Sequence, residues 1–404
     1  MHPSEPYVSI WIVAGVALFL LAAAMLALWL LLRARNMQNW IGSYLFRSRP
    51  PKVEGPIHVM FCFVDHFEPM WHGADLATQR SRVDRWCSEY RELASRHHDA
   101  DGRPPQHTFF YPEEEYAEEH LDKIAALCAD GYGEIEIHLH HDNDTESNFR
   151  ETISRFCRIL HERHGALPVD PASGEVRFGF IHGNWCLDNS RPDGRWCGIN
   201  NELTLLRELG CYADFTLPSA PSDTQTSTIN SIYYATDDPL APKSHDRGEL
   251  VRTGGRASGD LMIVQGPLRL NWRERRMGLV PRIEASDVRR GCPPTPARVD
   301  AWVDTGIHVQ GRPEWVFVKV HTHGTQEQDM DTLLGSSADA MHSHLEQAYN
   351  DGSRHVLHYV SSREVYNIIK AAEAGKRGNP NDYRDFVLPP PPSSWAGARM
   401  RKVA

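Results

Sequence analysis

The stretch Ile57–Pro69, IHVMFCFVDHFEP, decides the fold class, because it joins a strand to a group of ionisable side chains. Ile57–Val64 is a strand-like, largely apolar run. Asp65, His66 and Glu68 follow at once, so they stand where the strand ends. In barrels of parallel strands, the chemistry is found at these carboxyl ends.

From residue 56 onward, strand-like runs alternate with segments of helical periodicity, such as the spacing of Val83, Trp86 and Tyr90. The other strand-like runs are His107–Tyr111, Glu134–His140, Val176–Ile181, Cys211–Thr216, Trp315–His321 and His355–Val360. Such alternation is typical of an α/β fold with parallel strands and crossover helices, and the number of units predicts a closed or nearly closed barrel. Residues 222–313 are rich in Pro, Gly, Arg and Asp, and we expect a long insertion over one face.

The composition excludes several classes of protein. The 404 residues carry a formal net charge of −10, which argues against a nucleic-acid partner. The mean hydropathy is negative, so a polytopic membrane protein is excluded. The eight cysteines form no Cys-x-x-Cys pair, and a zinc knuckle is therefore not expected. The 22 histidines are the unusual feature, because His is the commonest metal ligand and a general acid or base near neutral pH.

One segment predicts a membrane anchor. Ile10–Leu32 has no charge and would span roughly 34 Å as a helix, enough to cross a bilayer. Arg and Lys residues follow it and none precedes it, so the positive-inside rule favours a single-pass protein of the bacterial inner membrane with a cytoplasmic catalytic domain. An exported domain with disulfides is the alternative. The expected organisation is a short tail at 1–9, the span at 10–32, a basic linker at 33–55, a catalytic domain at 56–375 and a Pro-rich tail at 376–404.

Ionisable residues recur at the ends of five predicted strands. They are Asp65, His66 and Glu68; His138, His140, His141, Asp142 and Asp144; His182; Asp214; and His321 and His323. Asp and His are ordinary ligands of zinc and related divalent ions. With a carboxylate to accept a proton from water and an imidazole to protonate a leaving group, the set suits hydrolysis of an amide or ester.

The order of these pieces resembles the polysaccharide deacetylases with a NodB-homology domain, carbohydrate esterase family 4. In that family a Thr-Phe-Asp-Asp strand end is followed by a Thr-Phe-Phe strand and a His-rich metal segment. Here Thr108-Phe109-Phe110 precedes Glu136-Ile137-His138-Leu139-His140, Leu209-Gly210 leads to Asp214, and Val320-His321 ends a late strand. The resemblance covers roughly 56–220 and 313–370 and implies a distorted (β/α)7 barrel with a divalent metal ion, zinc or similar.

The resemblance also implies roles for individual residues. Asp65 is the base, His321 the acid, and Asp214 the group that orients His321. His66, His140 and Asp144 are the metal ligands. The family's Arg-x-Pro-Tyr motif is absent, and Ile181–Trp185 stands in its place, so His182, Trp185 and His138 are expected to bind substrate. The register of the first motif leaves an alternative, in which Asp65 is itself a ligand and the base is missing.

These features predict a membrane-anchored hydrolase that removes an acyl group from an amino sugar or glycan intermediate, in the biosynthesis of a surface polysaccharide. Its partners would be the N-acylated sugar or glycan and the lipid bilayer, with no nucleic acid. Two alternatives stay open. The altered first and third motifs also suit a catalytically inactive, membrane-tethered glycan-binding protein, and His138-x-His140 also suits an amidohydrolase-type metalloenzyme.

Overall fold

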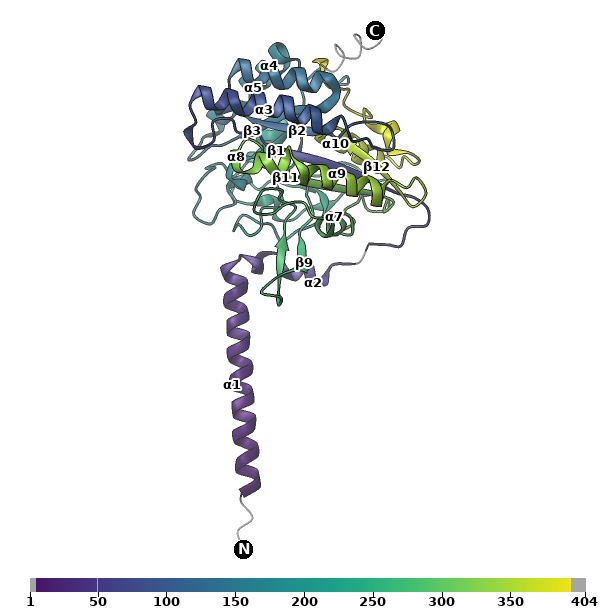
Figure 1. Cartoon of the computed structure of the whole chain (residues 1–404). Coiled ribbons are helices and arrows are strands. Elements are labelled where there is room, and N and C mark those ends of the chain that lie inside the picture. The colour runs from purple at the N-terminus through teal and green to yellow at the C-terminus, as the bar shows by residue number, and fades with distance from the viewer. Residues whose placement is uncertain (1–4, 49, 394–404) are drawn as a thin grey trace.

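The structure is a computed structural model that describes residues 5–48 and 50–393. Its centre is a mixed, mostly parallel sheet of ten strands, surrounded by helices (Figure 1). The strands of this sheet are β1 (Ile57–His66), β2 (His107–Pro112), β3 (Gly133–Leu139), β4 (Phe178–His182), β5 (Cys211–Asp214), β6 (Ile232–Ala235), β7 (Glu249–Leu250), β8 (Leu261–Val264), β11 (Trp315–Thr322) and β12 (His355–Val360). The runs expected from the sequence thus form strands.

β1 lies at the centre of the pairing. The sheet order is β11-β1-β2-β3-β4-β5-β8-β6-β7, and β12 also pairs with β1. One edge of β1 pairs with β11, whereas its other edge pairs first with β12 and then, from Phe63, with β2. Among the described strands of this sheet, β6 alone is reversed, because it pairs antiparallel with both β7 and β8. The carboxyl ends of the parallel strands therefore meet on one side.

The hydrogen-bonded ladder of the described strands ends at β11 and β7, so it does not close into a barrel. The sheet nevertheless curves back on itself. Lys319 on β11 donates to the carbonyl oxygens of Phe215 and Leu217, which follow β5. Gly266, just after β8, approaches the backbone of Lys319 so closely that a Cβ would lie 2.4 Å from its carbonyl oxygen. The curved sheet thus has an inner face, closed by Lys319, and an outer face.

Helices surround the sheet, and all but the last of them cover its outer face. They are α3 (Leu76–Ala94), α4 (Glu118–Leu127), α5 (Glu146–His164), α6 (Glu202–Glu208), α7 (Pro296–Val303), α8 (Glu327–Leu333), α9 (Ser336–Tyr349) and α10 (Ser362–Glu373). Their starts follow local capping: the Asp75 side chain accepts from the Thr78 amide, and Ser361 and Glu364 form a capping box. Apolar residues of α3 to α9 and of the outer face form one large core. Val365, Ile368 and Ile369 of α10 belong instead to the inner core.

Residues 222–313 do not simply lie over one face, as the sequence suggested. β8 pairs parallel with β5 through Asp214 and Ile263, and β6 pairs with β8, so this segment extends the main sheet. The reason is burial, since all four residues of β8 lie in the interior. Only β9 (Arg269–Arg276) and β10 (Val280–Glu284) form a separate hairpin, which projects on the side where the N-terminal helix leaves the domain (Figure 1).

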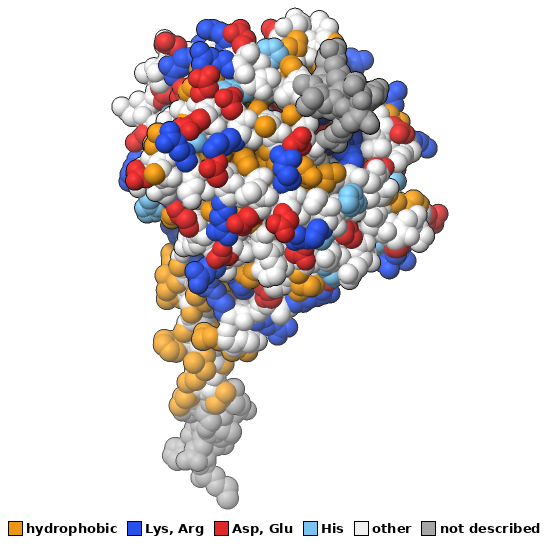
Figure 2. Space-filling view, turned by 45° about the horizontal axis from the view of Figure 1, so that its top comes forward, with side chains coloured by type: hydrophobic (Ala, Val, Ile, Leu, Met, Phe, Trp, Pro, Cys, Tyr) orange, Lys and Arg blue, Asp and Glu red, His pale blue; other side chains and the backbone are white. Residues whose placement is uncertain are grey.

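The N-terminal helix α1 (Glu5–Ala34) stands away from the domain as a stalk (Figures 1 and 2). Within it, Trp11–Ala34 is long and apolar enough to cross a membrane, as judged by length and composition. The segment predicted as a linker then folds against the domain through η1 (Met37–Asn39) and α2 (Ile41–Phe46). Trp40 is fully buried there, together with Ala220, Ile229, Leu268 and Ala285.

The Pro-rich segment after residue 375 is more ordered than its composition suggested. Arg363 donates to the carbonyl oxygens of Arg384 and Leu388, and Leu388 is buried. The Ser393 amide still donates to the Gly165 carbonyl. Hydrogen bonds from buried donors thus attach this segment to the domain. Parts of the predicted terminal tails, residues 1–4 and 394–404, lie outside the described residues.

Candidate metal centre and pocket

The pleat of the strands sorts the predicted site residues between the two faces of the sheet. Successive side chains of a strand point to opposite faces. On β1, Phe61 and Phe63 pack in the outer core, whereas Cys62 and Val64 pack in the inner one. His66 shares the parity of the inner residues. Its ring lies 4.8 Å from that of His138, 6.5 Å from that of His321 and 4.5 Å from that of His323, measured between centroids.

Two groups of possible metal ligands meet in this inner cluster and share one carboxylate. The first comprises His66, Glu68 and His323, and the second comprises Glu68, His138 and His140. Within each group, one ligand atom from every residue lies within 4.8 Å of the others. His66, Glu68 and His138 are buried. The cluster joins the ends of β1, β3 and β11, three strands that are not consecutive in the sequence.

The second group has the hydrogen bonds expected of metal ligands. Nδ1 of His138 bonds the Ile181 carbonyl at 2.8 Å, and Nδ1 of His140 bonds the Glu114 carboxylate. Because a carbonyl can only accept, Nδ1 of His138 carries the proton, and the neutral ring leaves a lone pair on Nε2. Nε2 of His138 lies 3.2 Å from Glu68 Oε1, and Nε2 of His140 lies 3.6 Å from it. Imidazoles held in this way by a carbonyl or a carboxylate are the usual form of a metal-binding His.

The charge states agree with this arrangement. Burial, with His323 and His138 nearby, holds the pKa of His66 well below its usual range, so the ring is neutral. Burial also lowers the pKa of His138, and His140 adds to the effect. Burial alone would raise the pKa of Glu68, but its contacts with His138 and His323 bring it below the usual value. Burial would lower the pKa of His140, but Glu114 and Glu68 raise it above its usual value. A buried carboxylate faced by the neutral rings of His66 and His138 is a site that a divalent cation fits.

A pocket of about 280 Å³ opens beside this cluster. It is lined by His321, His323, Trp185, Asp287 and Arg289, among others. Nδ1 of His321 is buried and has no hydrogen-bond partner among the described residues. The pocket therefore presents a free imidazole, a carboxylate and an aromatic ring next to the candidate metal centre.

Asp65 does not join the inner cluster. Its parity is that of the outer residues, and its two oxygens accept from Nε2 of His107 at 2.8 Å and from the Gly324 amide at 2.6 Å. The indole of Trp86 in turn donates to the Gly324 carbonyl. Asp65 is fully buried in this network, so neither the base nor the ligand role expected for it is reflected in its contacts. It instead holds the turn after β11, which carries His323.

Asp214 also lies apart from His321, the residue it was expected to orient. Its carboxylate accepts from the amide and the hydroxyl of Thr216. Burial raises the pKa of Asp214 to about 7, whereas Thr216 and Lys319 oppose the rise. Burial lowers the pKa of Lys319 to about 7. These two groups face one another on the inner face, below the cluster of histidines.

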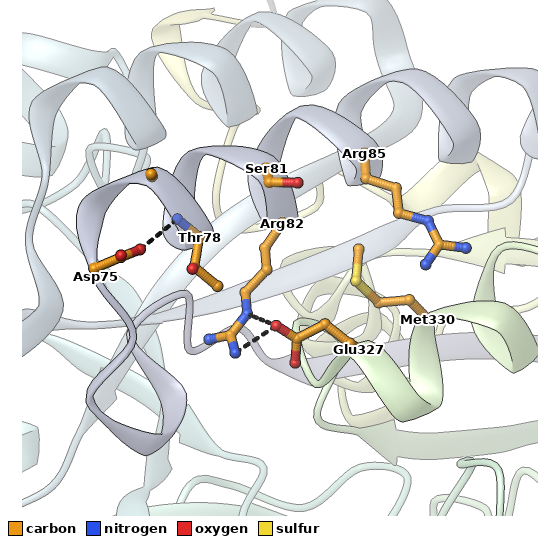
Figure 3. A pocket seen from close by; sticks show the side chains of 8 residues that line it. Asp75, Thr78, Ser81, Arg82, Arg85, Glu327 and Met330 are labelled. Carbon is orange, nitrogen blue, oxygen red and sulfur yellow. Dashed lines mark hydrogen bonds and ion pairs between the residues drawn. The ribbon is translucent and has the colours of Figure 1, made fainter.

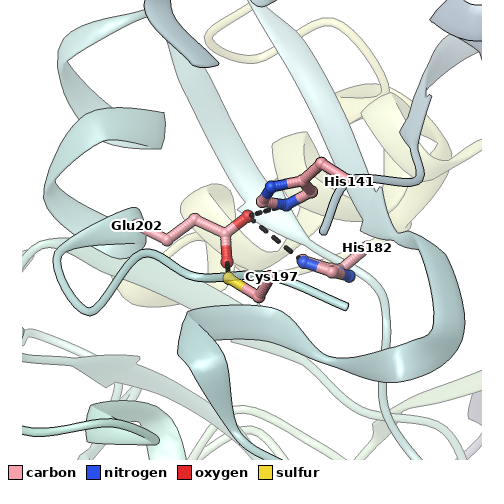
Figure 4. Close-up of side chains that lie close together, drawn as sticks. All are labelled: His141, His182, Cys197 and Glu202. Atoms are coloured by element: carbon pink, nitrogen blue, oxygen red, sulfur yellow. Dashed lines mark hydrogen bonds and ion pairs between the residues drawn. The ribbon is translucent and has the colours of Figure 1, made fainter. Parts of the chain in front are cut away.

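His140 and Asp144, expected to hold one ion together, belong to different clusters. Asp144 Oδ2 lies 3.2 Å from Nδ1 of His141. His141 in turn lies with His182, Cys197 and Glu202 in a second, buried group (Figure 4). His182 is fully buried, so it has no surface for the predicted contact with substrate. The cause is again the alternation of side chains along a strand, because Phe180 and His182 both lie on the outer side of β4.

Sequence reasoning gave no role to three residues of the inner cluster and its surroundings. Glu68 is the shared carboxylate, Glu114 fixes the tautomer of His140, and His323 completes the first group. Glu68 follows His66 by two residues, which was the only available signal. Because β1 ends at His66, the pleat no longer determines the direction of a later side chain.

A second pocket, of about 380 Å³, is lined by residues that hold the loop carrying Glu68 in place (Figure 3). Arg82 donates to the carbonyl oxygens of Pro69 and Trp71 and pairs with Glu327 at 2.6 Å. The Thr325 hydroxyl donates to the Glu68 carbonyl. The guanidinium of Arg82 is therefore fully engaged, and this pocket supports the metal centre rather than offering a separate site.

Among known proteins, the chain has a distant likeness to a solved structure. No family model and no curated protein matches the chain. A solved structure described as a "putative polysaccharide deacetylase from Mycobacterium smegmatis" aligns with a TM-score of 0.41 and 15% identity, covering 82% of this chain and 97% of that one. Similarity at this level assigns no residue and no activity to the chain.

Proposed function

We propose that this protein is a membrane-anchored, metal-dependent hydrolase that removes an acyl group from an N-acylated sugar or glycan. The observation that carries the proposal is the inner cluster, in which Glu68 is shared by His66, His138, His140 and His323 at the carboxyl mouth of a parallel sheet. The motif resemblance to polysaccharide deacetylases supports the choice of reaction, and we interpret the curved sheet as a distorted (β/α)7 barrel.

Glu68, His138 and His140 would hold a divalent ion, zinc or similar, with His66 and His323 on its other side. Such an ion polarises a carbonyl oxygen and lowers the pKa of bound water. The contacts support this set in place of the expected set of His66, His140 and Asp144, because Asp144 bonds within the other group. Arg82 and Thr325 keep Glu68 in position from behind.

Proton transfer falls to the residues that line the pocket. His321 lines the pocket and its buried Nδ1 has no hydrogen-bond partner among the described residues, so we assign it the acid that protonates the leaving amine. Asp287 supplies a carboxylate to the same pocket, and we assign it the acceptor of the proton from water. Asp65 is then a positioning residue for the His323 turn, and Asp214 a partner of the buried Lys319.

Trp185 offers a flat apolar face to a sugar ring at the edge of this pocket. The pocket also lies close to the membrane-proximal segment, because Ala220 lines it and packs against the buried Trp40. The Lys and Arg residues after the apolar span favour a cytoplasmic domain. The eight free thiols are compatible with that side of the membrane.

The experiment uses the full chain in detergent and a panel of N-acetylhexosamine oligosaccharides, with acetate release and bound metal as readouts. We expect metal in the wild type and loss of the inner ion in Glu68→Gln. We expect acetate release to fall by about 10²-fold or more in that variant. Glu118→Gln is the matched control, since that carboxylate is exposed on α4 and should change neither readout.

Two results would decide against the proposal. If Glu68→Gln retained the full metal content of the wild type, the inner cluster would not be the metal centre. If the wild type bound oligosaccharide and metal but released no acetate from any member of the panel, the chain would be a tethered glycan-binding protein.

A further inference from the structure

A second group of ligand-type side chains lies outside the pocket and plays no part in the proposed reaction. His141 follows β3, His182 ends β4, Cys197 lies in the loop 183–201, and Glu202 begins α6 (Figure 4). One ligand atom from each of the four lies within 4.8 Å of the others. His182, Cys197 and Glu202 are each 0% exposed. Four chain segments thus converge on one buried point.

Two of these side chains face each other without a proton between them. Nδ1 of His182 bonds the Gly183 carbonyl, so Nε2 carries a lone pair. That Nε2 is buried, has no hydrogen-bond partner, and lies 3.6 Å from Glu202 Oε1. A lone pair aimed at a buried carboxylate is unfavourable, and a cation bound between them would remove the repulsion.

The other two side chains complete the shell. Nε2 of His141 lies 3.2 Å from Glu202 Oε1, and Cys197 Sγ lies 3.5 Å from Glu202 Oε2. A tetrahedral zinc ion with N, O and S ligands at about 2.0–2.3 Å sets those ligands roughly 3.3–3.7 Å apart. The backbone amide of Asn189 donates to Cys197 Sγ at 3.3 Å, a bond that suits a thiolate.

We propose that His141, His182, Cys197 and Glu202 form a second metal site, which binds a tetrahedral divalent ion of the zinc type. Thiolate and carboxylate together supply two negative charges, and the two imidazoles are neutral, so a divalent cation leaves the buried site without net charge. Asp144, 3.2 Å from Nδ1 of His141, is the carboxylate behind that ligand.

The ion would hold the loop 183–201 in a conformation that its sequence does not favour. Several residues of this loop other than Gly have positive φ, among them Trp185 at 57°, Asp188 at 53° and Trp196 at 69°. Such conformations persist where the surroundings fix them. The loop carries Trp185 into the pocket, so this structural ion would set the position of the indole without contacting substrate.

A proton is the competing occupant. The two ring nitrogens of His141 lie 3.2 Å from Asp144 Oδ2 and 3.2 Å from Glu202 Oε1. In a chain without the ion, an imidazolium would therefore bridge the two carboxylates, with Cys197 as a buried thiol. The two states differ in the charge of the sulfur, and this difference can be observed.

The test is cobalt substitution of the full chain in detergent, followed by absorption spectroscopy. A thiolate bound to Co²⁺ gives a sulfur-to-metal charge-transfer band in the near ultraviolet, and none of the inner-cluster ligands is a sulfur. We expect the band in the wild type and in Glu68→Gln, and its loss, with one equivalent of metal, in Cys197→Ser. Cys186→Ser is the matched control, because Cys186 is buried in the same loop but belongs to neither group, and this variant should keep the band.

Absence of the band from cobalt-loaded wild-type protein would overturn the proposal, and this result does not depend on whether any variant folds. A band that survives in Cys197→Ser would equally overturn it. The proposal does not rest on the hydrolase reaction, since loss of the inner ion in Glu68→Gln leaves the band in place.

Discussion

His321 is the side chain on which the proton-transfer assignment depends. It lines the pocket, its Nδ1 has no partner among the described residues, and it belongs to neither metal group. We therefore expect His321→Ala to lower acetate release by about 10²-fold while the metal content stays unchanged. Turnover and bound metal are measured on the same preparation.

His344→Ala provides the comparison, because His344 lies on α9 and bonds Asp300 outside the pocket. An unchanged rate in His321→Ala would move the acid role to His323. Loss of metal would instead show that His321 is a ligand.

The positions of single residues show which parts of the candidate site could be predicted from the sequence and which could not. The structure brings the rings of His66, His138, His140 and His321 together at the strand ends that the sequence singled out. The pattern of residues at the strand ends did not distinguish the inner face of the sheet from the outer one. Asp65 was therefore assigned to the site, although its side chain lies on the other face. The sequence shows which residues of a strand share one face. Which of the two faces points inward depends on how the sheet curves, and this cannot be seen in the sequence.

At the scale of elements, β3 carries a buried carboxylate with a testable pH dependence. Burial raises the pKa of Glu136 from 4.5 to about 8, against hydrogen bonds from Tyr212 and the Gly179 amide. The folded state therefore keeps a proton that the unfolded state releases near pH 4.5. This stabilisation is fully present below pH 4.5 and is lost as the pH rises through about 8.

We expect Glu136→Gln to reduce the fall in the free energy of unfolding between these pH values, because the amide stays neutral. Urea unfolding at a series of pH values measures the effect. Glu118→Gln should show the same pH slope as the wild type. An equal slope in Glu136→Gln would mean that Glu136 is ionised in the folded protein.

The elements themselves were predictable where periodicity was strong, as in α3, α5 and β11. The segment 222–313 was not, because β6 and β8 are four residues each and are separated by turns. Strands this short have little local signal, and their place in the sheet is set by pairing with β5. The docking of Trp40 was equally hidden, since its partners are distant in the sequence.

At the scale of the whole molecule, the β9–β10 hairpin and α1 lie on the same side of the domain (Figure 1). The hairpin tip exposes apolar side chains, with Met277 91% and Leu279 79% exposed, and carries Arg273, Arg275 and Arg276 nearby. Apolar residues among arginines suit the interface of a bilayer that contains anionic lipids. We expect the tip to lie in this interface.

A fluorophore sensitive to polarity, attached at Met277→Cys in full-length protein with Cys87 and Cys292 replaced by Ser, would test this placement. In anionic liposomes its emission should shift to the blue and be quenched by a lipid-borne quencher. Ala126→Cys on α4, at the far end of the domain, is the control and should do neither. Equal behaviour of the two labels would place the hairpin in water.

The burial of Trp40 next to Ala220 has a consequence for how the enzyme would select its substrates. A flexible linker would let the pocket move through a wide volume. If α1 spans a membrane as proposed, the chain that follows it is instead attached at once to the wall of the pocket through Trp40 and Ala220. The pocket would thus lie at a fixed distance from the lipid surface. For a glycan carried on a lipid, only a sugar at the matching distance from the lipid headgroup would then reach the metal.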